Sequence, residues 1–150
     1  AGFATAIDLL NEYIEVKETQ TIFPENNVTK MTSILKNNLL KNKQLTFIGP
    51  QKERLPNNLS FLCHTKSMIP IKGREIVRLL SQYGVYISSG SACSSSSQGP
   101  NPILVAINVD KPLQESGIRI TIGPWISNDD INSVSNIIYE SLKSLELKKQ

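Results

Sequence analysis

Gly117-Ile118-Arg119-Ile120-Thr121-Ile122 decides the fold, because apolar and polar side chains alternate along it without a break. Successive side chains of a β-strand point to opposite faces of a sheet, so this period of two predicts a strand. We expect the isoleucine face to be buried, which puts Arg119 and Thr121 on the opposite face. Other elements must then cover the isoleucines.

A long helix is expected to follow this strand. Ser127 is an N-cap residue, and Asp129 and Asp130 fall in the first turn, where the helix dipole favours negative charge. The apolar residues behind them recur at steps of three and four, as in the buried stripe of a helix. They are Ile131, Val134, Ile137, Ile138, Leu142 and Leu145.

The preceding part of the chain alternates between short apolar runs and segments of helical period. The apolar runs predict strands at residues 45–48, 59–63 and 85–87. The helical segments are residues 3–16, a stretch from about Pro24 into the Asn/Lys-rich residues 36–43, residues 73–83 stopped by Gly84, and residues 102–107. Strands interleaved with helices predict a small sheet covered by helices, a two-layer α+β domain.

Composition indicates one globular domain. The chain has 150 residues, of which 39% are hydrophobic, enough to bury a core. Much of its formal net charge of +3 lies at the C-terminal end, in Lys143, Lys148 and Lys149, and no basic cluster with aromatic residues points to nucleic acid. The sequence contains neither a secretory signal nor an apolar run near the roughly 20 residues that span a bilayer. Two cysteines without other signs of export favour a reducing compartment, which is the cytoplasm, or an organelle in a eukaryote.

Residues 88–101 have no apolar period and almost nothing to bury, yet they contain Cys93. A structural cysteine sits among apolar neighbours and is inert, and Cys63, at the end of an apolar run, fits that description. Cys93 is therefore a candidate nucleophile, since a thiol that solvent reaches is partly thiolate. The alternative is a flexible linker that happens to contain a cysteine, and composition leaves both open.

Arg119 is the second candidate, because a guanidinium offers a planar, permanently charged fork that matches a carboxylate. A solvated strand charge is the alternative, and spacing alone favours it. His64 is the only histidine, and no local signature pairs it with Cys93 as a protease dyad. We expect it to be a satisfied strand-end residue. Two cysteines and one histidine show no metal-ligand spacing, and the Gly-rich phosphate-loop motifs are absent.

Together these residues resemble a known family. Ser88-Ser89-Gly90-Ser91-Ala92-Cys93-Ser94-Ser95 resembles the active-site cysteine motif of group I cysteine desulfurases. The residues from Gly73 to Ile87 look like the helix and strand before that cysteine, and 117–123 resemble the strand whose arginine holds the substrate carboxylate. The helix that starts at Ser127 is similar to the family's last one. The resemblance covers most of the chain and is most specific over residues 73–146.

The resemblance implies a pyridoxal 5'-phosphate (PLP) enzyme that converts L-cysteine to L-alanine and leaves a persulfide on Cys93. Arg119 would bind the substrate carboxylate. The sulfur would pass to an acceptor or iron–sulfur scaffold protein, and the full-length enzyme would be a homodimer. Residues 1–20 would be a helix that leads in from a large domain, and 21–150 the small C-terminal domain of a fold-type I PLP-dependent transferase, with a mobile cysteine loop at 88–101.

Two features depart from the family pattern. Pro124-Trp125 stands where many relatives have a basic residue and an aromatic one, so Trp125 is given no role. The family's S-x-H-K motif, which carries the lysine that binds PLP, is absent. The sequence also opens without Met, in helix-like sequence, so we expect the cofactor-binding domain to precede Ala1 and the isolated chain to be inactive. The rivals are a non-enzymatic persulfide carrier and a basic RNA-binding module.

Overall fold

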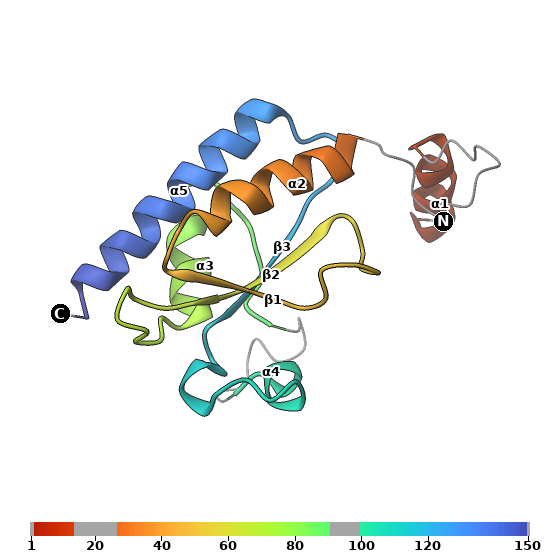
Figure 1. The fold of residues 1–150 in the computed structure, drawn as a ribbon. Helices are drawn as coiled ribbons and strands as arrows, with labels where there is room; N and C mark the ends of the chain where they lie inside the picture. Colours follow the sequence, from red (N-terminus) through yellow and green to blue (C-terminus); the bar gives the residue numbers. More distant parts are fainter. Residues whose placement is uncertain (1, 14–26, 91–99, 150) are drawn as a thin grey trace.

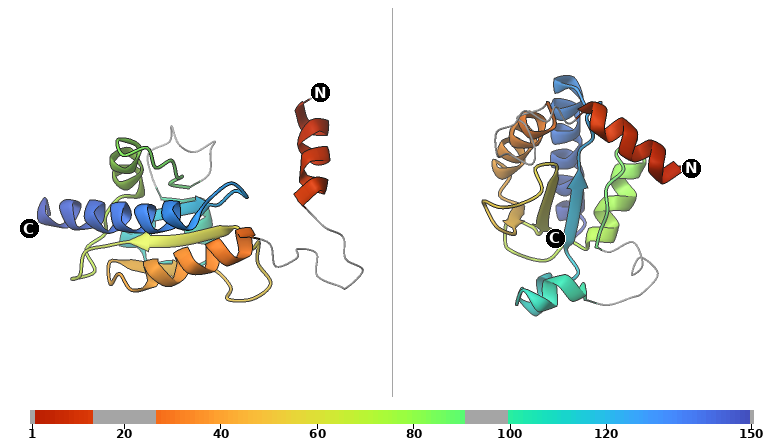
Figure 2. Two further views of the ribbon diagram at one scale, coloured as in Figure 1. Left: turned by 90° about the horizontal axis from the view of Figure 1, so that it is seen from above. Right: turned by 90° about the vertical axis from the view of Figure 1, so that its right-hand side faces the viewer.

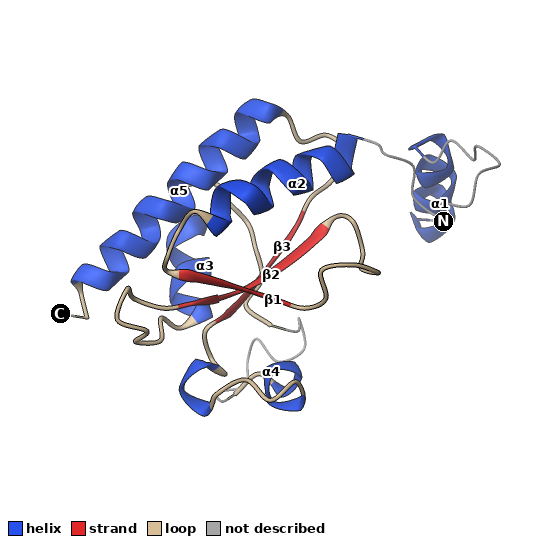
Figure 3. Cartoon of the chain, viewed as in Figure 1, coloured by secondary structure: helices blue, strands red, loops and turns tan. Residues whose placement is uncertain are grey.

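The computed structural model describes residues 2–13, 27–90 and 100–149 (Figure 1). In chain order its elements are α1 (Gly2–Tyr13), α2 (Asn27–Leu40), β1 (Leu45–Ile48), β2 (Asn58–Cys63), α3 (Gly73–Ser81), α4 (Pro102–Ala106), the 3-10 turn η2 (Lys111–Leu113), β3 (Gly117–Thr121) and α5 (Asn128–Leu147). The α+β class predicted from the sequence is confirmed: one sheet carries helices around it (Figure 3). The expected start of a helix near Pro24 and the end of the first helix at residue 16 lie outside the described residues.

The sheet has three antiparallel strands in the order β1-β2-β3. Directly paired residues share a face of a sheet. One cross-strand row joins Phe47, Phe61 and Ile118, and the two phenylalanine rings meet edge to face at 5.4 Å. The next row joins Ser60 to Arg119 on the opposite face. The alternation along β3 thus separates an apolar face from a polar one, as the sequence predicts.

The apolar face is covered by α2, α3 and α5, and α2 and α5 run side by side across it (Figure 1). Ile118, Ile120 and Ile122 are all buried in this core. The stripe of α5 contributes Ile131, Ile138, Leu142 and Leu145. No helix within the described ranges is long and apolar enough to cross a membrane.

The ends of α3 and α5 follow the predicted capping chemistry. Ser127 and Asp130 form a capping box at the start of α5: the Ser127 side chain accepts a hydrogen bond from the Asp130 amide, and the Asp130 carboxylate accepts one from the Ser127 amide. Gly84 follows α3 with φ of +74°, a conformation that glycine adopts at low cost.

The strand predicted at residues 85–87 is wrong. The amide of Val85 donates to the carbonyl of Leu80, which closes the C-terminal end of α3 as in a Schellman cap. Tyr86 then projects into solvent. Among the described residues of this segment, only Ser88 pairs with the sheet, and it does so as an isolated bridge to Arg119.

On the polar side of the sheet lies α4, away from α2 and α5 (Figures 1 and 2). Its buried residue Leu104 approaches Gly117, so closely that a Cβ on this glycine would be 2.9 Å from the leucine Cδ1. Gly117 shares its face with Arg119, two residues further along β3. Therefore α4 covers one end of the polar face, next to Arg119.

Candidate functional site

Arg119 lies in the middle of β3, half-buried, on the sheet face that the core helices leave uncovered. Its cross-strand neighbour is Ser60. Within the described ranges, no Asp or Glu carboxylate lies within ion-pair distance of its guanidinium. A half-buried cation without a carboxylate partner among the described residues can offer its hydrogen-bonding fork to an anion from outside.

Ser88 lies on the outer edge of β3, opposite Arg119. The Ser88 amide donates to the Arg119 carbonyl at 3.0 Å, and the Arg119 amide donates to the Ser88 carbonyl at 2.7 Å. These two bonds form a narrow antiparallel pair. The start of the cysteine segment is thereby fixed to the strand position that carries the predicted carboxylate-binding residue. Sequence reasoning missed this role of Ser88, because a single bridge leaves no periodic signal.

The end of the cysteine segment is fixed close to the start of the same strand. The Asn101 amide donates to the Gln114 carbonyl at 2.9 Å, and Gln114 lies three residues before β3. The Asn101 side chain also caps α4 by accepting from the Ile103 amide at 2.9 Å. Residues 91–99 therefore connect two anchors, Ser88 and Asn101, that are both bonded to β3 or its approach.

Gly73 packs against both β3 and the cysteine segment. A Cβ on Gly73 would lie 2.2 Å from the Gly117 carbonyl oxygen and 3.1 Å from Ser89 Cβ. Its amide donates to the Glu115 carbonyl at 2.9 Å. Only glycine allows the first turn of α3 to approach this closely. Gly73 belongs to the stretch that resembles the desulfurases, but the sequence alone did not indicate why glycine is needed.

The predicted nucleophile Cys93 lies outside the described residues, so its role stays a prediction. Cys63 is described, and it is the inert thiol that the sequence predicts. It is fully buried in the core, and burial raises the pKa of its thiol strongly, which suppresses the reactive thiolate. This removes Cys63 as a nucleophile.

His64 is a satisfied strand-end residue, as expected. It is buried, its Nδ1 donates to the Thr65 carbonyl at 2.8 Å, and its Nε2 lies 2.9 Å from Thr46 Oγ1. Since a carbonyl only accepts, Nδ1 carries a proton, and in the neutral ring Nε2 accepts from the threonine hydroxyl. Both nitrogens are occupied, so His64 is not poised as a base.

Trp125 lies just beyond β3 and is 80% exposed. Its six-membered ring covers Gly123, where a Cβ would approach ring carbons to 2.4 Å. An indole held over the backbone at the end of β3, with its outer face in solvent, offers an apolar surface close to the Arg119 strand. The sequence gives no basis for assigning it a role in the site.

The chain matches the model of the family described as aminotransferase class-V over residues 1–134. The chain belongs to this class-V family. Among its relatives, the cysteine desulfurase IscS of Dictyoglomus turgidum is 39% identical over 105 residues, which are 68% of this chain and 25% of that protein. The mitochondrial cysteine desulfurase of Candida albicans is 30% identical over 147 residues, 97% of this chain and 27% of that protein. The chain therefore spans about a quarter of the length of these two relatives.

One solved structure supports the same family, and a second one shares the fold. A NifS-like protein matches 78% of this class-V chain and 27% of its own, with a TM-score of 0.62 and 26% identity. A NifS-like protein from Rickettsia africae shares the fold over 81% of this chain and 30% of its own, with a TM-score of 0.65 at 19% identity. The chain is thus a fragment homologous to the NifS- and IscS-like cysteine desulfurases, and the family prediction is confirmed.

Membership of the class-V family implies that the parent enzyme binds PLP. The histidine of this chain and the lysine closest to it in sequence do not form a PLP site. The histidine that would cover the ring has no counterpart, since His64 has both ring nitrogens engaged inside the fold. The lysine closest to it in sequence, Lys66, is exposed at a turn, where its amide is bonded to Glu146. His64 and Lys66 therefore do not form a PLP site in this chain.

Proposed function

We propose that the chain is the C-terminal part of a cysteine desulfurase, in which Arg119 binds the carboxylate of L-cysteine and Cys93 accepts its sulfur. The observation that carries the proposal is the paired backbone of Ser88 and Arg119. It links the cysteine segment to the candidate carboxylate site, as an enzyme that acts on one small amino acid requires. PLP and the lysine that binds it would lie in a preceding large domain.

Arg119 suits the first role because its guanidinium, half-buried and without a described carboxylate partner, provides two parallel N–H donors. In the second role, the Cys93 thiolate attacks the sulfur of the substrate. An S–S bond forms on Cys93, the substrate C–S bond breaks, and the electron pair left on carbon takes up a proton to give alanine. A bound PLP would supply the electron sink for that pair. This chain does not, which explains the expected inactivity of the isolated chain.

The test is a chimera, in which this chain replaces the matching segment of the Dictyoglomus turgidum relative. We expect the chimera to release alanine from L-cysteine and to carry a persulfide on Cys93, located by mass spectrometry. The Cys93→Ser chimera should bind PLP and L-cysteine but form neither product. A folded, PLP-loaded chimera that makes no alanine, or one whose activity survives Cys93→Ser, contradicts the proposal.

The isolated chain separates this proposal from a persulfide carrier. With added PLP and L-cysteine it should release no alanine, and with a low-molecular-weight persulfide donor it should hold no stable persulfide. Stable persulfidation of Cys93 without alanine production would favour the carrier. The sulfur acceptor and a homodimeric parent remain predictions that rest on the family. A cytoplasmic or organellar location remains a prediction that rests on the cysteine content.

A further inference from the structure

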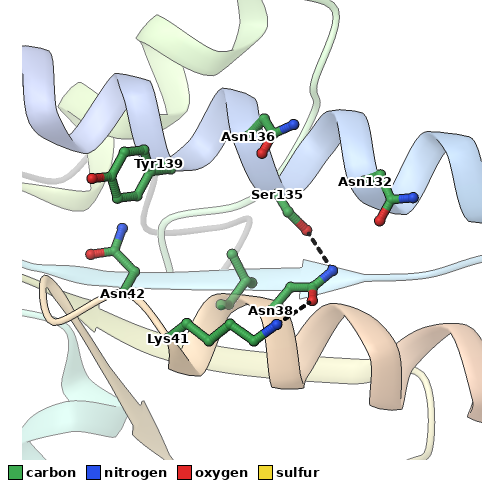
Figure 4. Close-up of a pocket in the computed structure, with 8 residues that line it drawn as sticks. Asn38, Lys41, Asn42, Asn132, Ser135, Asn136 and Tyr139 are labelled. Atoms are coloured by element: carbon green, nitrogen blue, oxygen red, sulfur yellow. Dashed lines mark hydrogen bonds between the residues drawn. The ribbon is translucent and has the colours of Figure 1, made fainter.

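Asparagine side chains gather at a pocket in the helical layer, between α2 and α5 (Figure 4). Its volume of about 380 Å³ lies within the range of small-molecule sites. Six of its lining residues carry a side-chain amide or hydroxyl: Asn38, Asn42, Asn132, Asn136, Ser135 and Tyr139. The pocket is separated from Arg119 by the sheet and core, so it is independent of the proposed function.

Asn42 is the informative residue of this pocket. It is 8% exposed, and its Oδ1 accepts from the Gln44 amide at 2.9 Å. Because this bond fixes the amide group, Nδ2 is aimed the other way, toward Tyr139 (Figure 4). Within the described part of the chain, Nδ2 has no hydrogen-bond acceptor. Buried donors in native proteins are almost always satisfied, so this one marks a position for an acceptor from outside the chain.

The charge of the pocket favours an anion. Lys41 supplies a cation, and none of the lining residues is Asp or Glu. The Lys41 ammonium donates to Asn38 Oδ1 at 3.4 Å, and Asn38 Nδ2 reaches Ser135 Oγ across the two helices at 3.5 Å (Figure 4). Both contacts are longer than ordinary hydrogen bonds, so a charged acceptor would displace little.

We propose that this pocket binds a small carboxylate, with one oxygen on Asn42 Nδ2. The exposed Lys41 side chain, whose Nζ lies at Asn38 Oδ1 in the structure, would swing toward the ligand to compensate its charge. One cation matches the single charge of a carboxylate, whereas a phosphate dianion would leave a charge uncompensated. Asn42 Nδ2 is itself covered in the structure, so the Tyr139 side chain, which is 46% exposed, would have to turn aside to admit the ligand. The carboxylate belongs either to a free small acid or to the C-terminus of a peptide.

Nuclear magnetic resonance of the full chain tests the proposal through the side-chain amide signal of Asn42. Acetate, inorganic phosphate, the dipeptide acetyl-glycyl-glycine and the C-terminal amide of that dipeptide are titrated separately. We expect a saturable shift with one or both acids and none with the amide. Binding of acetate identifies a free acid as sufficient, and binding of the peptide acid alone identifies a C-terminus.

Two variants and a control make the test specific. Asn42→Asp keeps the acceptor for the Gln44 amide but replaces the Nδ2 donor by an oxygen, so binding should be lost. Lys41→Gln should weaken it by about tenfold, as loss of a charge-assisted bond does. Asn37→Asp makes the same chemical change on an exposed position of α2 outside the pocket, and binding should stay within about twofold.

An absent or non-saturable shift in the wild type, equal binding by Asn42→Asp, or tighter binding of phosphate than of acetate would overturn the proposal. Should Asn42→Asp fail to fold, Lys41→Gln decides, because its side chain is at the surface and its loss leaves the core intact. Unchanged affinity in Lys41→Gln then counts against the site.

Discussion

Ser88 and Arg119 exchange two backbone hydrogen bonds, at 3.0 and 2.7 Å, so the segment that carries Cys93 starts on the strand residue that we propose as the carboxylate anchor. Cys93 follows Ser88 by five residues, which limits its Cα to within about 18 Å of the Ser88 Cα. Asn101 returns the segment to Gln114, just before the same strand. The two described anchors of the segment, Ser88 and Asn101, are thus bonded to β3 or to the residues just before it.

Arg119→Ala should raise the KM for L-cysteine in the chimeric desulfurase by about 10- to 150-fold, the effect of losing a charge-assisted contact of about 1.5–3 kcal/mol. Arg119→Lys keeps the charge but not the planar fork, so its KM should be intermediate. Steady-state alanine release measures both. Arg78→Ala, at an exposed position of α3, is the matched control and should leave KM unchanged. An unchanged KM in Arg119→Ala would show that Arg119 is a solvated charge on the strand and does not bind the substrate.

The strand and its polar face were accessible from sequence because both follow from a local period. The isoleucines of β3 alternate with Arg119 and Thr121, and burial in the structure follows the same alternation. The cap at Ser127 was equally local, since its partner Asp130 lies three residues away. Patterns of this kind need no knowledge of the rest of the fold.

The contacts that organise the site were not accessible, because they join distant parts of the chain. Ser88 pairs with a residue 31 positions away through backbone atoms alone, which any side chain would allow. The same region misled the strand prediction at 85–87, where the apolar residues belong partly to the end of α3. Cys93 was proposed from its polar surroundings and from the family resemblance, and it lies outside the described residues.

Gly73→Ala should destabilise the fold by about 1–3 kcal/mol, as overpacking of a tight contact does. The added methyl would meet the Gly117 carbonyl at 2.2 Å, so α3 must shift away from β3 and from Ser89. Thermal or urea unfolding measures the loss. Gly2→Ala is the control, because nothing lies within 4 Å of a Cβ there and alanine favours a helix. Equal stability of the two variants would show that the close approach at Gly73 does not constrain the fold.

The two thiols should differ in their reactivity toward an aromatic disulfide reagent. In the native chain one thiol should react rapidly, and in denaturant both should. Cys63 is fully buried and its pKa is raised, so the rapid thiol should be Cys93. Cys93→Ser should remove the rapid phase and Cys63→Ala should retain it. A rapid phase that survives Cys93→Ser would contradict the assignment.

Ser127→Ala should destabilise the chain by about 1 kcal/mol at neutral pH, the usual effect of losing an N-cap. The side-chain and backbone hydrogen bonds of Ser127 lower the pKa of Asp130. A carboxyl whose pKa is lower in the folded state stabilises the fold above its unfolded pKa, about 3.9, and this contribution disappears as the pH falls through the folded value. The Ser127→Ala variant lacks the side-chain bond to the Asp130 carboxylate. Its loss of unfolding free energy should therefore be largest near pH 7 and should shrink in acid.

Urea unfolding at pH 7 and pH 3 measures the change, with Ser133→Ala on the exposed face of α5 as the matched control. A deficit that is the same at both pH values would show that Ser127 acts through its cap alone and that its bond to the Asp130 carboxylate adds nothing to stability.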